Sequence, residues 1–198
     1  MTMRGYIGMY RLFAACLLAL MLAACSVFPD TPPRPELHDF GAPPADGVEP
    51  SGLPGGIALR EADAPMWLRG PEIRYRRADH DATMVGVYTR RQWVAPPPTL
   101  LTARLSAHLA DSEHNGRFHL YLELANFEQV FLSEDDAVVR AQVRATLLDT
   151  AGDRAPRRQL FSVERSAPSA DGAGAVKGLV AAVDEVVEDI LRWLPNAE

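Results

Sequence analysis

Residues 88–109 read YTRRQWVAPPPTLLTARLSAHL, and this stretch joins a strand to a helix. The β-branched and aromatic residues at its start and just before it predict a strand over 83–89. The prolines at 96–98 end strand pairing because they lack an N–H, and for the same reason they suit the first turn of a helix. Apolar residues then recur every three or four positions, so we expect a helix over 98–112 with one apolar face.

Length and charge limit the class of protein. The 198 residues allow one domain of ordinary size with additional segments. The net charge is −6, without a basic block or interleaved aromatic and basic residues, so we expect no nucleic-acid partner. Many of the 16 Pro and 14 Gly residues precede Gly70, and we therefore expect the first third of the chain to add little packed core.

The N-terminus has the pattern of a secretory signal peptide over residues 1–24. Arg4 and Arg11 are its charged side chains, and an apolar run over 12–24 ends in small residues before Cys25. The run is shorter than the roughly 20 apolar residues of a membrane-spanning helix. Its ending, Leu-Ala-Ala-Cys, resembles a bacterial lipobox. That resemblance implies cleavage before Cys25, diacylglycerol on its sulfur, and a fatty acyl chain such as palmitate on its amine. The alternative is an uncleaved anchor, or a secreted protein whose cysteine is incidental.

Lipidation of Cys25 has consequences for the mature chain. Cys16 leaves with the signal peptide, so no thiol remains for a disulfide or for cysteine catalysis. Several acyl chains hold a protein firmly on a membrane. Ser26 rather than Asp follows the cysteine, which, by analogy with sorting in enteric bacteria, favours the periplasmic face of the outer membrane, with the inner membrane as the alternative.

Composition divides the rest into a tether and a domain. Residues 25–56 are rich in Pro, Gly and Asp, and we expect a lipidated, flexible tether in which His38 and Phe40 could begin an edge strand. We expect the folded domain over 57–198, with its first strand near 57–61.

Periodicity predicts the remaining elements. A short strand is expected over 73–76, and apolar and polar residues alternate over 117–131 and 137–149, with a further strand over 158–166. Turn residues between these three long segments predict an antiparallel meander. An amphipathic helix is expected over 175–194. The predicted fold class is therefore α+β, a two-layer domain with a mostly antiparallel sheet and two amphipathic helices packed on one face.

Several motifs in this order resemble the ABC-type transport auxiliary lipoproteins, the PqiC-like family. They are Ile73-Arg-Tyr75, Arg91-Gln-Trp93 before the prolines, Asn126-Phe-Glu-Gln-Val-Phe131 and the apolar C-terminal helix, together with the lipobox. The resemblance covers most of the chain from residue 57 to 194.

The resemblance implies a partner role in lipid transport across the envelope. Such systems pair an ABC transporter or another inner-membrane protein with Mce-domain proteins, and the lipoprotein serves at the outer membrane. Mce-domain and ABC transporter components are thus the implied partners, phospholipid or another apolar solute is the implied cargo, and a homo-oligomer is expected. The alternative is an envelope assembly lipoprotein that activates a cell-wall enzyme or helps an outer-membrane protein.

Aromatic and apolar residues are the candidate contacts for a partner or a lipid. Trp93 could anchor a partner, although large aromatics more often pack in a core. Phe127 and Phe131 lie at odd positions, whereas the apolar residues over 118–124 lie at even ones, which predicts a bulge or a strand end that presents an apolar surface, with Val130 beside them. Partner or lipid contact and plain packing both remain open for Phe127, Val130 and Phe131.

The sequence gives no sign of catalysis. The five His residues show no HExxH spacing and no clustering with carboxylates, which argues against a metal site. Serines lack a nucleophile-elbow setting, and the glycines over 172–178 fit neither phosphate-binding pattern. We therefore expect a non-enzymatic protein without a cofactor or a metal.

Overall fold

The computed structural model describes residues 34–44, 56–109 and 116–194. The predicted signal peptide and Cys25 lie outside these residues. The described residues from Pro35 onward form one compact unit.

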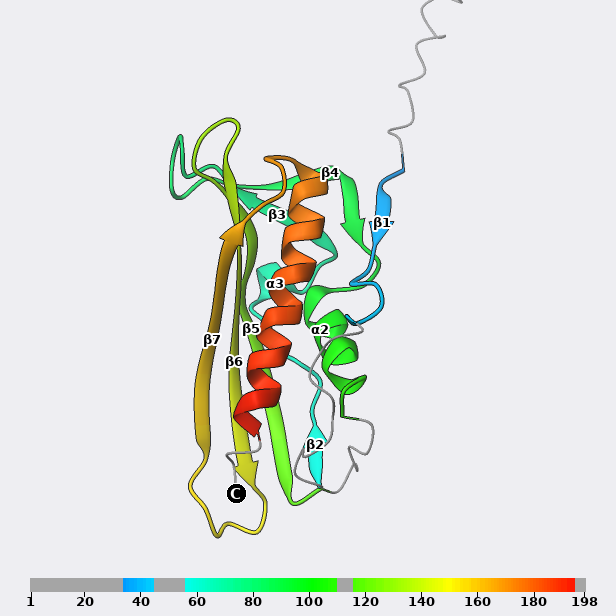
Figure 1. The fold of residues 1–198 in the computed structure, drawn as a ribbon, viewed down its shortest axis with the longest axis vertical. Helices are drawn as coiled ribbons and strands as arrows, with labels where there is room; N and C mark the ends of the chain where they lie inside the picture. The colour runs from blue at the N-terminus through cyan, green and yellow to red at the C-terminus, as the bar shows by residue number, and fades with distance from the viewer. Residues whose placement is uncertain (1–33, 45–55, 110–115, 195–198) are drawn as a thin grey trace, which may run out of the picture. The chain divides into compact units, whose positions relative to one another are not determined.

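The domain is built on one mixed sheet of seven strands (Figure 1). Six strands follow the order β1-β4-β3-β5-β6-β7, and β2 pairs with β5 off this path. The strands are β1 (Glu36–His38), β2 (Ile57–Leu59), β3 (Glu72–Arg76), β4 (Val85–Trp93), β5 (Phe118–Phe131), β6 (Ala137–Asp149) and β7 (Arg157–Ser166). A short 3-10 helix, η2 (Met66–Leu68), lies between β2 and β3 in the sequence.

The long strands confirm the predicted antiparallel meander. β5 pairs with β6 and β6 with β7, both antiparallel, and the bounds of all three lie within one residue of those predicted from alternation. The other side of β5 is shared by two parallel partners, β2 near residue Phe118 and β3 near Gln129. The sheet is therefore mixed, and its longest ladders are antiparallel.

Two helices cover one face of this sheet (Figure 1). α3 (Gly172–Trp193) lies over β5, β6 and β7, and α2 (Pro97–Ser106) contacts both β5 and α3. α2 begins at the prolines as predicted, but it ends before residue 112, because His108 and Leu109 form tighter hydrogen bonds to carbonyls three residues back. The two-layer α+β prediction is thus confirmed.

The folded domain begins at Glu36 rather than at residue 57. β1 pairs in parallel with the end of β4, so the expected edge strand near His38 is present. Phe40 follows it into the core, where its ring lies 5.3 Å from that of Trp93 and 5.9 Å from that of Phe127. Sequence patterns did not show that this segment belongs to the domain, because three residues are too few to show a periodicity. The residues around it are also polar and rich in proline.

A buried polar side chain connects the sheet to the start of α3. Gln129 of β5 accepts a hydrogen bond from the Tyr88 hydroxyl and donates one to the Ser169 carbonyl at 2.9 Å. Burial raises the pKa of the Tyr88 hydroxyl, so it stays protonated as the donor. This network satisfies a buried amide and fixes the loop that precedes α3.

Candidate functional site

The face of the sheet opposite α2 and α3 carries polar contacts between strands. On β6, Val139, Ala141 and Val143 are buried on the helix side, and the residues between them point the other way. There Arg140 pairs with Glu164 of β7, and equivalent contacts join Gln142 to Ser162 and Arg144 to Glu123. We call this side of the sheet, which neither α2 nor α3 covers, the open face.

A β-bulge changes which residues of β5 reach the open face. Leu124 is paired with Val143 of β6, and Asn126 is paired with Gln142, the adjacent residue of β6. Ala125 is therefore an extra residue in β5. Leu124 is buried before the bulge and Phe127 after it. β5 therefore contains a bulge, one of the two alternatives indicated by the sequence, but it lies at Ala125 rather than within residues 127–131. It directs the next even-numbered residues away from the helices.

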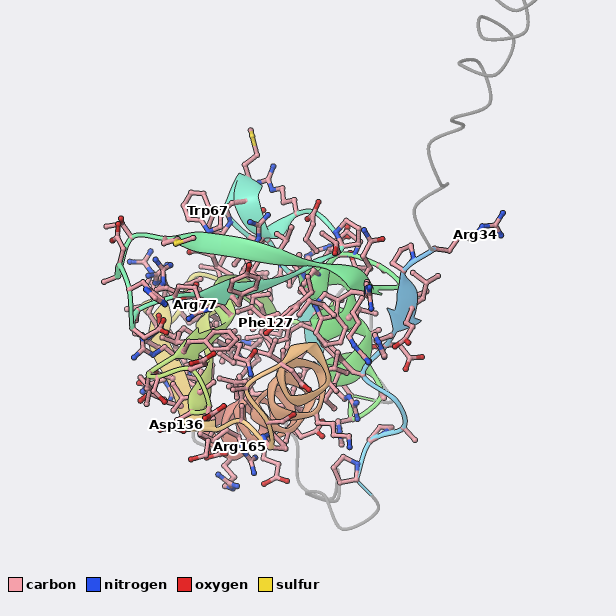
Figure 2. All side chains as sticks on the ribbon, turned by 90° about the horizontal axis from the view of Figure 1, so that it is seen from above. Arg34, Trp67, Arg77, Phe127, Asp136 and Arg165 are labelled. Carbon is pink, nitrogen blue, oxygen red and sulfur yellow. The ribbon has the colours of Figure 1, made fainter. Side chains whose placement is uncertain are left out.

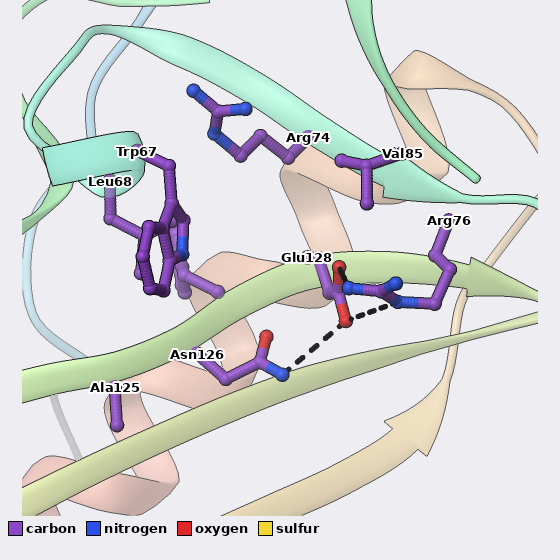
Figure 3. Close-up of a pocket in the computed structure, with 9 residues that line it drawn as sticks. Trp67, Leu68, Arg74, Arg76, Val85, Ala125, Asn126 and Glu128 are labelled. Carbon is purple, nitrogen blue, oxygen red and sulfur yellow. Dashed lines mark hydrogen bonds and ion pairs between the residues drawn. The ribbon is translucent and has the colours of Figure 1, made fainter. Parts of the chain in front are cut away.

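A pocket of about 390 Å³ lies at this bulge. Figure 3 shows Trp67 of η2 on one side of it and Arg76 of β3 on the other, with Glu128 between them. The volume falls within the range of small-molecule binding sites. The residues that line the pocket are Trp67, Leu68, Arg74, Arg76, Val85, Ala125, Asn126, Phe127 and Glu128.

An ion pair forms the polar part of the pocket. Nε and Nη2 of Arg76 each donate to a carboxylate oxygen of Glu128 at 3.0 Å, and the Asn126 amide lies 3.3 Å from the same carboxylate (Figure 3). Arg76 also donates to the Ala82 carbonyl at 2.9 Å. Glu128 is almost fully buried, and the two hydrogen bonds from Arg76 neutralise its charge and fix its position. This ion pair therefore forms a rigid wall of the pocket.

Two residues that line the pocket, Trp67 and Val85, have exposed apolar side chains, and Met66 and Val87 are exposed neighbours of these residues in η2 and β4. Trp67 is 62% exposed and Met66 82% exposed, and Val85 and Val87 of β4 are also exposed. Val85 and Val87 are two residues apart in one strand and point to the same side. We call Met66, Trp67, Val85 and Val87 the apolar rim. Such a gathering on one face is typical of a contact surface.

The candidate contact residues lie in the interior. Trp93 and Phe127 pack with ring centroids 5.7 Å apart and are 1% and 2% exposed. Val130 and Phe131 are also buried, and Phe131 packs edge-on against Tyr75 at 5.7 Å. The geometry therefore supports the packing alternative for these residues, and Phe127 reaches the pocket only as part of its inner wall.

The apolar rim was not identified from the sequence. Figure 2 shows Trp67 at the periphery of the domain and Phe127 in its interior. One signal was available, since Met66-Trp67-Leu68 stands between Pro65 and the Gly70-Pro71 turn, where an aromatic has few neighbours to pack against.

Within residues 34–44, 56–109 and 116–194, no group of three His, Cys, Asp or Glu side chains is placed to hold a metal ion. His114 lies outside this range. In the same part of the chain, no helix is long and apolar enough to cross a membrane.

The two-layer domain matches solved structures over most of its length. A crystal structure from Xanthomonas campestris aligns with a TM-score of 0.63 at 17% identity, covering 83% of this chain and 94% of that one. A second, an uncharacterised protein, aligns with a TM-score of 0.60 at 15% identity, covering 81% and 99%. At these identities the likeness concerns the fold. A comparison with curated proteins gave no match.

The sequence identifies the family. The pattern of the ABC-type transport auxiliary lipoprotein component matches residues 40–191, which is most of the chain. This chain belongs to that family.

Proposed function

We propose that this protein is a non-enzymatic lipoprotein, anchored by acyl chains on Cys25 to the periplasmic face of the outer membrane. It would serve as the auxiliary component of an ABC/Mce-type system that moves phospholipid or another apolar solute across the envelope. Membership of the auxiliary family and the lipobox support this proposal.

The observation that carries the partner role is the apolar rim around the pocket on the open face. Trp67 and Met66 expose most of their surface, and an exposed Trp beside a pocket is a typical anchor for a partner. The wall behind them is held by the Arg76–Glu128 pair, so the surface is preorganised rather than assembled on contact. This combination supports docking more than catalysis, because the pocket's carboxylate is already bound to an arginine.

A homo-oligomer belongs to the same proposal. β7 is the last strand of the sheet, and on its outer side no further strand pairs with it in the described part of the chain. Its ten residues offer backbone groups to a second copy. Native mass spectrometry of the lipidated protein in detergent would report the number of copies, and a monomer at all concentrations would contradict this part.

Site-specific crosslinking tests the partner role. A photo-crosslinking residue replaces Trp67 in the full-length lipidated protein, and the matched control replaces Leu132, which is 51% exposed in the turn after β5. We expect position 67 to capture an Mce-domain protein or a transporter component in envelope membranes, and position 132 not to. Capture of a cell-wall synthase or an outer-membrane β-barrel at position 67 would favour the assembly alternative. Equal capture at both positions would contradict docking through the rim.

A further inference from the structure

The ladder along one side of β5 has a gap. β3 is five residues long, but its pairing with β5 starts only at its fourth residue, Tyr75, opposite Gln129. Before that point, the segment that follows β2 reaches as far as Leu124, whose N–H donates to the Asp63 carbonyl at 2.8 Å. In the described part of the chain, no strand therefore pairs with residues 125–128 on this side of β5.

The pocket on the open face lies in this gap. Residues 125–128 all line it, together with Arg74 and Arg76 of β3 (Figure 3). Because no strand fills the gap, the pocket reaches the core. Leu68 and Phe127 line it, although they are only 4% and 2% exposed. Strand backbone without a partner, beside a pocket that can take a side chain, is the arrangement by which sheets bind extended peptides.

Arg74 is the cation of the pocket that has donors to spare. The guanidinium of Arg76 already donates to Glu128 and to the Ala82 carbonyl. Arg74 makes no hydrogen bond within the described residues, and its nearest carboxylate, that of Glu72, is 3.7 Å away and partly exposed. Glu72 therefore offsets the charge of Arg74 through a solvated contact but leaves its N–H donors unpaired. A second carboxylate that enters the pocket can accept two of these donors at once.

We infer that the pocket binds a short extended peptide segment of the docking partner, with an apolar side chain against Leu68 and Phe127 and a neighbouring carboxylate on Arg74. The inference rests on the proposed docking of a partner at the open face. The unpaired backbone favours a peptide over a lipid, because a peptide offers N–H and C=O groups in strand spacing. The amide oxygen of Asn126 can accept a further peptide N–H, since its NH2 group is the one that contacts Glu128.

Crosslinking from inside the pocket identifies the occupant. A photo-crosslinking residue replaces Val85, which lines the pocket and is 45% exposed, in the full-length lipidated protein. Adducts formed in envelope membranes are digested and mapped by mass spectrometry. We expect one stretch of the protein that position 67 captures, with an Asp or Glu next to an aliphatic or aromatic residue. A phospholipid adduct, or a stretch without an acidic residue, would overturn the inference and leave docking intact. Absence of any captured protein at position 67 would overturn both.

Charge variants test the carboxylate contact. With the photo-crosslinking residue at position 67, Arg74→Glu should lower capture of the partner at least about tenfold, because it places like charges together. The matched control is Arg90→Glu, an exposed arginine of β4 outside the pocket, and it should leave capture unchanged. Replacing the mapped acidic residue of the partner by Arg should restore capture by Arg74→Glu, which a folding defect would not allow. Unchanged capture in Arg74→Glu, or no restoration by the reversed pair, would overturn the inference.

Discussion

In the interface between the two helices, Nη1 of Arg104 on α2 lies 3.3 Å from Oδ1 of Asp184 on α3. The arginine is 4% exposed, and its Nη2 donates to the carbonyl of Phe40. Burial raises the pKa of Asp184, and the nearby Arg104 charge acts in the opposite direction. One guanidinium thus connects α2, α3 and the segment after β1, all three of which cover the helix side of the sheet.

Replacing Arg104 by Met tests the contribution of this connection to stability. The change leaves Asp184 half-buried without its cation and the Phe40 carbonyl without its donor. We expect the free energy of unfolding to fall by about 2–3 kcal/mol, measured by urea denaturation. The control is Arg192→Gln, since Arg192 pairs with Glu188 at the surface, and it should cost no more than about 0.5 kcal/mol. Equal losses in the two variants would contradict a special role for Arg104.

The pairing of Arg117 with Asp149 predicts a pH dependence. Two hydrogen bonds from Arg117, at 3.2 and 2.9 Å, lower the pKa of the Asp149 carboxyl below its usual 3.8, and the Ala151 N–H acts in the same direction. A lowered pKa in the folded state stabilises the protein above pH 3.8, and this contribution is lost as the pH falls through the folded-state pKa.

Asp149→Asn should therefore lower the urea midpoint at pH 7. The difference from the unmodified protein should shrink as the pH falls below 3.8. Asp153→Asn is the matched control, because Asp153 also contacts Arg117, at 3.0 Å, but is exposed. A midpoint difference for Asp149→Asn that stays constant between pH 7 and pH 3 would rule out this ionic contribution.

The start of α3 depends on its N-cap. The Asp171 carboxylate accepts the Gly174 N–H at 2.8 Å and the Ser169 hydroxyl at 2.7 Å. Asp171→Ala should cost about 1 kcal/mol of unfolding free energy and speed hydrogen exchange at Gly174, whereas Asp171→Ser should retain most of the stability. No change in exchange in the Ala variant would show that tertiary packing alone holds this turn.

The sequence was informative where periodicity is long and local. β6 and α3 were predicted closely because 13 and 22 residues show a clear period of two or of about 3.6. β1 and β2 are three residues each and pair in parallel with strands far along the chain, so no local pattern marks their pairing. Their place in the sheet follows from tertiary contacts alone.

The candidate site was harder to predict for a related reason. Arg76 and Glu128 are 52 residues apart and meet only because β3 pairs with β5 beyond the bulge. The sequence indicated a bulge or a strand end over residues 127–131, whereas the bulge lies at Ala125, and the sequence did not indicate which side of the sheet the helices cover. The sequence therefore left both surface contact and packing open for Phe127. In the structure, η2 and β4 expose apolar side chains through Trp67 and Val85.

Substitutions at Phe127 and Trp67 separate packing from partner contact. Phe127 is 2% exposed and packs against Trp93 and Phe40, so Phe127→Ala should lower the free energy of unfolding by about 3–5 kcal/mol. Trp67→Ala removes a side chain that is mostly exposed and should change it by no more than about 0.5 kcal/mol. Urea denaturation measures both.

For capture of the partner, we expect the reverse order: the substitution at Trp67 should have the large effect and the substitution at Phe127 the small one. Trp67→Ala should abolish recovery of the partner by chemical crosslinking in envelope membranes, although the domain remains folded. Phe127→Leu keeps most of the apolar volume and should leave capture unchanged, because Phe127 has almost no surface to offer a partner. The opposite result would be retained capture in Trp67→Ala and lost capture in Phe127→Leu at unchanged stability. The partner would then contact the aromatic core around Phe127 after the domain opens locally, and the apolar rim would have no role in docking.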